Sequence, residues 1–199
     1  MALKPPRERA LSRAKKRPLM AGREIAVHSQ NLTRLVREGA LERVARGTYR
    51  LADRPAGEHS SFAVVGTIAP HSVICLLSAL TFHGVGTQLP FEVWVAIERG
   101  TRPPALRNPP LRVVRMSGGS FTAGIEVHAI DGRKVRIYSV AKTIADLFKF
   151  RKRMGIDVAI EALRDAWQRR LVTIDEIDRY ARVCRVDRVM RPYVEALLA

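Results

Sequence analysis

The chain has 199 residues, of which 47% are hydrophobic, and a formal net charge of +16 at pH 7. The hydrophobic content suffices to bury a core, which excludes a chain that is disordered throughout, and the charge favours a polyanionic partner. Residues 1–51 hold 13 lysines and arginines against 4 acidic residues, and residues 52–199 hold 22 against 15. The positive charge is therefore concentrated near the start of the chain.

Two further features of the composition bear on the compartment. No run of 18 apolar residues occurs, so we expect no membrane span. The two cysteines, Cys75 and Cys184, both lie in apolar helical patterns and fit reduced core thiols. Together these features favour a cytoplasmic protein.

Three helical patterns open the chain, over residues 6–16, 20–27 and 30–38. Pro18 ends the first pattern, Ser29 is the expected N-cap of the third, and Gly39 its expected end. Two short strands, 41–44 and 48–51, then flank a turn that contains Gly47, which tolerates the positive φ of a hairpin turn. This order of helices and a basic hairpin predicts a winged helix-turn-helix.

The third helix has two different faces. Leu32, Leu35 and Val36 fall on one side at 100° per residue, and polar side chains that suit base edges and phosphates fall on the other. The residues expected to contact DNA from this helix are Gln30, Asn31, Thr33, Arg34 and Arg37. Those expected to contact phosphate or the minor groove from elsewhere are Arg43 and Arg46 of the wing and Lys15 and Lys16 before it.

A break in periodicity over residues 52–59 separates two predicted domains, a winged helix-turn-helix over 1–55 and an α+β domain over 56–199. In the second domain we expect two helices, 60–68 and 73–83, and then a small sheet of three or four strands. These strands are predicted over 92–97, 111–116, 125–130 and 134–138. The last two are joined by Asp131-Gly132, a hairpin turn signal.

A helical tail follows from Ser139. Apolar stripes predict helices that start near Val140 and Ile156 and a last helix through Met190. Thr173-x-x-Glu176 is a capping box that opens another. The predicted fold class is thus α+β: an N-terminal winged helix-turn-helix, then an α+β domain with a small sheet and a helical tail.

Catalytic motifs are weak in this sequence. Ser139-x-x-Lys142 matches the serine–lysine pair of penicillin-recognising enzymes, but their companion motifs are missing, so we expect Ser139 to cap a helix and Lys142 to face water. Glu126, Asp131 and Lys134 could suggest a nuclease cluster, although an Asp-Gly turn is expected there on geometric grounds. The histidines and cysteines have no metal-ligand spacing. We therefore expect no enzyme activity, metal or cofactor.

Two other segments have compositions that suggest a binding site, one rich in glycine and serine and one basic. The turn over residues 116–120 is too short for a phosphate-binding loop and lacks its lysine. A basic cluster, Lys149, Arg151, Lys152 and Arg153, lies at a helix end, where positive charge is favourable. It could also form a second contact with nucleic acid.

Three segments resemble the AbiEi family, the antitoxins of type IV abortive-infection toxin–antitoxin systems. They are Leu-Glu-Arg-Val-Ala-Arg-Gly-Thr-Tyr-Arg-Leu at 41–51, Ile-Cys-Leu-Leu-Ser-Ala-Leu-Thr-Phe-His-Gly at 74–84 with Val-Trp-Val-Ala-Ile at 93–97, and Val-Arg-Ile-Tyr-Ser-Val-Ala-Lys-Thr-Ile-Ala-Asp-Leu-Phe-Lys-Phe-Arg at 135–151. The resemblance spans nearly the whole chain, and the third segment is the most specific.

This resemblance implies an autorepressor that binds inverted operator repeats through its winged helix. It also implies a C-terminal domain that neutralises a nucleotidyltransferase-like toxin without necessarily binding it. Lys149, Arg151, Lys152 and Arg153 are the candidates for the antitoxin surface. The alternatives are a basic nuclease or RNA-modifying enzyme with a winged-helix docking domain, and a transcription factor that senses a ligand.

Overall fold

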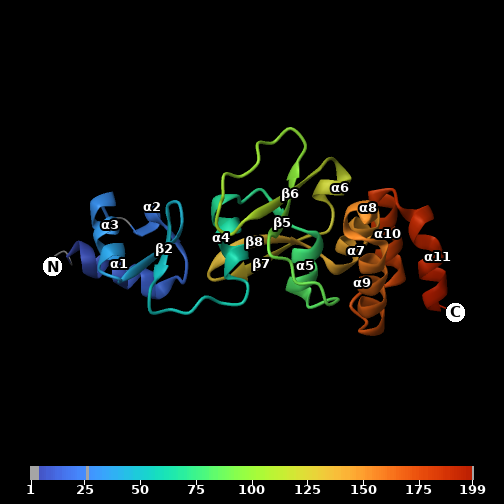
Figure 1. The fold of residues 1–199 in the computed structure, drawn as a ribbon, viewed down its shortest axis with the longest axis horizontal. Coiled ribbons are helices and arrows are strands. Elements are labelled where there is room, and N and C mark those ends of the chain that lie inside the picture. The colour runs from blue at the N-terminus through green and yellow to red at the C-terminus, as the bar shows by residue number, and fades with distance from the viewer. Residues whose placement is uncertain (1–4, 26, 199) are drawn as a thin grey trace. The chain divides into compact units, whose positions relative to one another are not determined.

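The computed structural model describes residues 5–25 and 27–198, without the side chains of Pro6 and Lys16 (Figure 1). The chain is mixed α+β, as predicted, and divides into two compact units. The first comprises Met1–Pro70, Pro104–Leu111 and His128–Val135. The second comprises His71–Pro103, Arg112–Val127 and Arg136–Ala199.

The first unit contains the winged helix-turn-helix. Its elements are α1 (Pro6–Lys16), β1 (Met20–Ala21), α2 (Gly22–Ile25), α3 (Ser29–Arg37), β2 (Leu41–Ala45), β3 (Thr48–Leu51) and α4 (Ser60–Ile68). The three strands form an antiparallel sheet in the order β1-β3-β2. Ala10 and Ala14 of α1 pack with Leu32 and Leu35 of α3 and with Leu41 of β2, so the helices and the wing share one core.

Two predictions for this region were wrong. Residues 20–27 do not form one helix: Met20 and Ala21 pair with Tyr49 and Thr48 as a third strand of the wing, and α2 follows as a single short helix. A two-residue strand inside an apolar run has no periodicity that could reveal it. Ser29 is the first residue of α3 rather than its N-cap, a position that His28 occupies without a side-chain hydrogen bond.

The first unit extends past the predicted boundary at residue 55. Leu19 packs with Ala63 and Val64 of α4, and partly buried Leu106 and Ile130 lie against the same cluster. Helix α4 and the hairpin turn within residues 128–135 therefore complete this unit. The loop predicted over residues 52–59 is present, but it lies inside the unit. Contacts between residues so far apart in sequence leave no local signal.

The described part of the chain also holds a five-stranded sheet with the order β6-β5-β4-β8-β7. Its strands are β4 (Val73–Ile74), β5 (Val93–Glu98), β6 (Leu111–Met116), β7 (Ile125–Ile130) and β8 (Arg133–Tyr138), with α5 (Leu76–His83) and α6 (Gly119–Thr122) between them. The sheet is larger than predicted because Val73 and Ile74, expected at the start of a helix, form its central strand. This strand runs antiparallel to β5 and parallel to β8.

The turn between β7 and β8 has the geometry that its sequence predicts. Asp131 and Gly132 both have positive φ, at 48° and 72°. Two consecutive residues of this kind make a tight turn whose twist matches that of the flanking strands.

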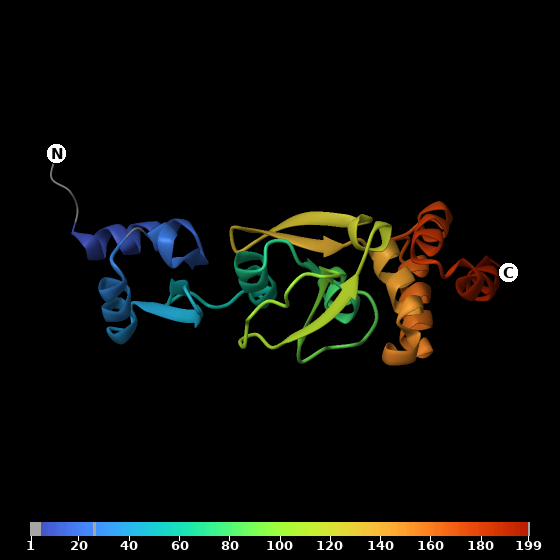
Figure 2. The same ribbon diagram turned by 90° about the horizontal axis from the view of Figure 1, so that it is seen from above.

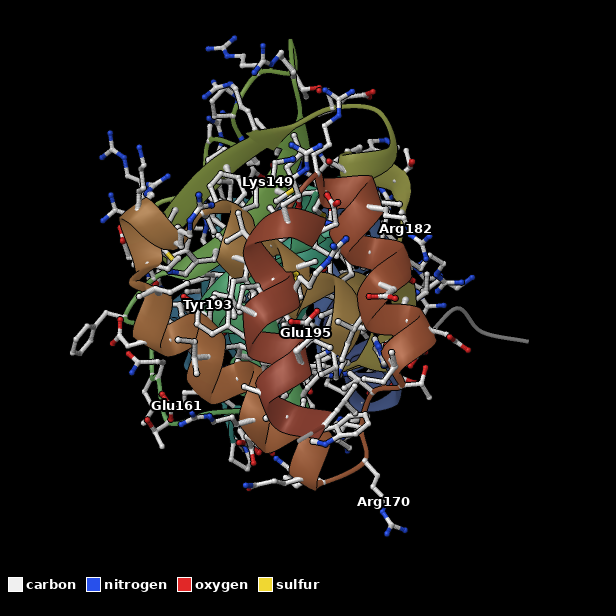
Figure 3. All side chains as sticks on the ribbon, turned by 90° about the vertical axis from the view of Figure 1, so that its right-hand side faces the viewer. Lys149, Glu161, Arg170, Arg182, Tyr193 and Glu195 are labelled. Carbon is white, nitrogen blue, oxygen red and sulfur yellow. The ribbon has the colours of Figure 1, made fainter. Side chains whose placement is uncertain are left out.

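Five helices close the described chain: α7 (Val140–Lys149), α8 (Arg151–Met154), α9 (Ile156–Gln168), α10 (Ile174–Cys184) and α11 (Asp187–Leu198). Figures 1 and 2 show α7, α9 and α10 side by side, with α11 against α10. The predicted capping box is present, since Thr173 and Glu176 bond each other's backbone N–H groups. On α11, Tyr193, labelled in Figure 3, packs its ring 5.4 Å from that of Phe148.

Candidate nucleic-acid interface

Helix α3 separates its apolar and polar residues as the sequence predicts. Leu32 and Leu35 are buried in the core of the first unit, and Val36 is half-buried against it. Gln30, Thr33, Arg34 and Arg37 are exposed, and Asn31 is half-buried at the margin. Gly39, with φ of 70°, ends the helix as expected and turns the chain into the wing. The helix therefore offers one continuous polar face to solvent.

The two arginines of this face differ in their partners. Arg34 donates from Nε to Glu38 Oε1 at 2.7 Å, and this hydrogen bond lowers the pKa of Glu38. Within the described residues, Arg37 makes no ion pair. Because exposed ion pairs add little stability, Arg34 can exchange its carboxylate for another acceptor at small cost.

The wing carries its own basic side chains. Arg43 on β2 and Arg46 in the turn are exposed, and Gly47 has the expected positive φ of 70°. The backbone N–H of Gly22 donates to the Gly47 carbonyl at 2.7 Å. This bond and the β1–β3 pairing tie the tip of the wing to the start of α2.

Further basic residues lie at the end of α1 and directly after it. Lys15 is exposed, and the side chain of Lys16 lies outside the described residues. Arg17 lies 3.6 Å from Glu24, between Nη1 and Oε1. Lys15 is thus the described lysine of this segment that is placed to reach a phosphate.

Glu24 is an organising carboxylate that the sequence analysis missed. It accepts from the backbone N–H of Ala21 at 2.8 Å and from both terminal nitrogens of Arg133, and Arg133 Nε also donates to the Leu19 carbonyl. The bonds from Arg133 are the largest of the effects that lower the pKa of Glu24 to about 2. Arg133 and Glu24 are 109 residues apart, so no spacing rule could have linked them.

The residues of the basic cluster near the start of α8 differ in their partners. Lys149 donates to Ser120 Oγ at 2.9 Å, and Arg151 donates to the Phe148 carbonyl at 2.9 Å. Arg153 instead lies over the ring of Trp94, 5.0 Å from its centre. Lys152 is exposed. The four residues predicted as an antitoxin surface therefore have different surroundings.

Of the two residues of the Ser139-x-x-Lys142 motif, Ser139 has the predicted position and Lys142 does not. The hydroxyl of Ser139 accepts from the Lys142 backbone N–H at 3.4 Å, which confirms the N-cap of α7. Lys142, however, does not face water. Its side chain is fully buried, donates to Asp146 Oδ2 at 2.6 Å and lies 4.0 Å from the centre of the Tyr138 ring. Its ammonium is thus held by the carboxylate of Asp146.

The surroundings of this ion pair raise the pKa of several neutral groups. Burial, and next the charge of Asp146, raise the pKa of the Cys75 thiol and raise that of Cys184 to about 12. The same two causes raise the pKa of Tyr138. The two thiols stay protonated at neutral pH, which fits their prediction as inert core residues.

Metal ligands and membrane-spanning helices are the next features to compare with the predictions. Within residues 5–25 and 27–198, no three side chains of His, Cys, Asp or Glu gather as metal ligands. In the same residues, no helix has the length and apolar character to cross a membrane.

Comparison with known proteins finds a family similar to the segment that contains α3 and the wing. Residues 20–52 match the family model described as "Transcriptional regulator, AbiEi antitoxin". This stretch is similar to the AbiEi family. It covers α2, α3 and the wing, and it confirms the predicted resemblance over those residues.

A solved structure supports the fold beyond residues 20–52. The crystal structure of the RV2827C protein from Mycobacterium tuberculosis is similar over 90% of this chain and 72% of that chain, with a TM-score of 0.62. At 12% sequence identity, this likeness concerns the fold alone. None of the curated protein sequences compared with the chain matches it.

Proposed function

We propose that this chain is a transcriptional autorepressor that binds inverted operator repeats through α3 and the wing. The observation that supports it best is the exposed polar face of α3, which presents Gln30, Thr33, Arg34 and Arg37 opposite a buried apolar face. Amides and arginines at such positions read adenine and guanine in the major groove. Asn31, at the margin of this face, completes the proposed base-reading set.

The wing and the segment before β1 supply the proposed backbone contacts. Arg43 and Arg46 of the wing, together with Lys15 and Lys16, would meet phosphates or the minor groove. These contacts carry no base information, and they fix the position of the recognition helix on the duplex.

An electrophoretic mobility shift with DNA from upstream of the chain's own gene tests this proposal. The double variant Arg34→Ala/Arg37→Ala should bind this DNA at least tenfold more weakly, since a base-reading arginine contributes about 1–3 kcal/mol. The control is Arg164→Ala/Arg188→Ala, which removes two exposed arginines from α9 and α11. Undiminished binding by a folded Arg34→Ala/Arg37→Ala protein would contradict the recognition-helix assignment.

We also propose that the chain is the antitoxin of a type IV system and has no catalytic activity. It would neutralise a nucleotidyltransferase-like toxin without necessarily binding it. The residues after the wing, 56–199 in the division predicted from the sequence, would carry this activity. Of the candidate antitoxin residues, Lys149 and Arg151 lie together beside one pocket, whereas Arg153 is held by Trp94. Growth of cells that co-express the toxin with Lys149→Gln/Arg151→Gln tests this assignment, with Arg164→Gln/Arg188→Gln, which removes the same charge from exposed positions on α9 and α11, as the control.

A further inference from the structure

A polar pocket of about 590 Å³ opens in the second unit. Its walls come from the turn before α6, from the α7–α8 junction and from the C-terminal end of α10. The volume falls within the range of about 300–1,000 Å³ that is typical of pockets for small molecules. The pocket is thus large enough for more than a single ion.

Three cations line this pocket from three separate elements. Lys149 ends α7, Arg151 begins α8, and Arg185 follows the last residue of α10. The lining contains no aspartate or glutamate. None of the three cations takes part in an ion pair within the described residues. Three like charges around a pocket whose lining has no carboxylate favour an anion between them.

Hydrogen bonds hold two of these cations in place. Lys149 Nζ donates to Ser120 Oγ at 2.9 Å, and the Ser120 hydroxyl donates in turn to the Val183 carbonyl at 3.2 Å. Arg151 Nη1 donates to the Phe148 carbonyl at 2.9 Å. Each bond uses one donor and leaves the other N–H groups of the cation for a ligand. Lys149 is labelled in Figure 3.

The turn before α6 contributes hydroxyl groups to the same pocket. Ser117 and Ser120 both line it, and Gly118 between them has φ of 54° and ψ of −140°. A side chain at Gly118 would meet open space, so glycine is favoured there by its backbone conformation alone. The sequence lacks a lysine next to this turn, which argued against a phosphate loop. The fold brings Lys149 to it from α7.

We propose that this pocket binds the phosphoryl group of a small phosphate monoester. An arginine fork, an ammonium group and the hydroxyl of Ser117 match the charge and the several acceptor oxygens of a phosphate dianion. The space beyond the phosphoryl group would hold the organic part of the ligand, against Val183 and Val186. This inference concerns the second unit and does not depend on DNA binding by α3.

Isothermal titration calorimetry of the full-length protein tests the proposal at constant ionic strength. Inorganic phosphate, adenosine monophosphate and glucose 6-phosphate are titrated separately, which distinguishes free phosphate, a nucleotide and a sugar phosphate as ligands. We expect at least one monoester to bind at one site. The variant Arg151→Gln/Arg185→Gln should bind it at least tenfold more weakly.

The matched control is Arg164→Gln/Arg188→Gln, which removes two arginines from exposed positions outside the pocket lining. It should change the affinity less than twofold. Arg185→Gln alone provides a second pocket variant if the double variant does not fold. Equal weakening by the pocket and control pairs would show non-specific attraction to a basic protein and overturn the proposal. Failure of all three ligands to bind would overturn it as well.

Discussion

Lys142 and Asp146 form a salt bridge that is fully buried within one helix, with 2.6 Å between Nζ and Oδ2. Further partners surround the pair: the Cys184 thiol donates to Asp146 Oδ1 at 3.3 Å, and the Tyr138 ring faces the ammonium. Burial raises the pKa of Asp146, and Lys142 opposes this rise. Each charge therefore depends on the other to be tolerated in the core.

Removing one partner of this pair should be far more harmful than removing both. Lys142→Met leaves the carboxylate without its counter-charge and should lower the free energy of unfolding by about 3–5 kcal/mol. The double variant Lys142→Met/Asp146→Leu leaves no buried charge and should be much closer to wild type. Urea denaturation measures both. Equal losses in the two proteins would show that packing, rather than charge, limits stability here.

This ion pair also shows where prediction from sequence ends. The apolar stripe of α7 was found by its period, and a charged residue beside such a stripe was assigned to water. Tyr138 of β8 and Cys184 of α10 cover that side of the helix. The sequence of residues 139–149 contains no signal that other elements would pack there. The spacing of four residues between Lys142 and Asp146 was the one available signal.

Elements defined by their own sequence were predicted well. Helix α3, the Gly39 stop and the wing turn depend on residues close together in the chain, and so do the α10 capping box and the Asp131-Gly132 turn. The strands β1 and β4 were missed because two residues are too few to show a period. The pocket beside α6 was missed because its serines and cations come from segments far apart in sequence.

Ser139 should be needed for stability and not for function. Ser139→Ala removes the hydroxyl that accepts from the Lys142 N–H, and loss of such a cap costs about 0.5–2 kcal/mol. Its 3.4 Å length favours the lower half of that range. Thermal unfolding, operator binding and toxin rescue are the measurements, with Ser139→Asp as the control that keeps a cap. Complete loss of function at unchanged stability would instead indicate a nucleophile.

Glu24 should make part of the stability depend on acid pH. Its pKa is lowered to about 2 in the folded chain, from an ordinary value of 4.5, first by the hydrogen bonds from Arg133. A carboxylate with a lowered folded pKa stabilises the protein above its unfolded pKa, and this contribution is lost as the pH falls from about 4.5 towards 2.

The variant Glu24→Gln isolates that contribution. At pH 6 it should reduce the free energy of unfolding by about 1–3 kcal/mol, the usual cost of losing charge-assisted hydrogen bonds. The difference from wild type should shrink as the pH approaches 2. Urea denaturation at several pH values measures it. A difference that is the same at pH 6 and pH 2.5 would show that Glu24 acts through packing instead.

Arg46 and Arg34 should differ in how they affect DNA binding. Arg46→Ala should weaken operator and unrelated DNA alike and lower the salt slope of the binding constant by about one unit, because the contact proposed for Arg46 is with phosphate. Arg34→Ala should weaken the operator more than unrelated DNA. Fluorescence anisotropy at several salt concentrations measures both. A loss confined to the operator in Arg46→Ala would assign base reading to the wing.

The winged helix-turn-helix of the first unit should be most stable when it keeps α4. A fragment of residues 1–57 contains α1 to β3, but it lacks Ala63 and Val64, which pack on Leu19, and Arg133, which holds Glu24. It should therefore unfold at a lower temperature and bind operator DNA more weakly than a fragment of residues 1–70, which regains α4 and little else. Small domains have few apolar contacts to spare, so this one helix should have a measurable effect. Thermal unfolding and mobility shifts compare the two fragments with the full chain.

Neither fragment should rescue cells from the cognate toxin, because both lack the second unit. Rescue by residues 1–57 alone would show that repression suffices for antitoxicity.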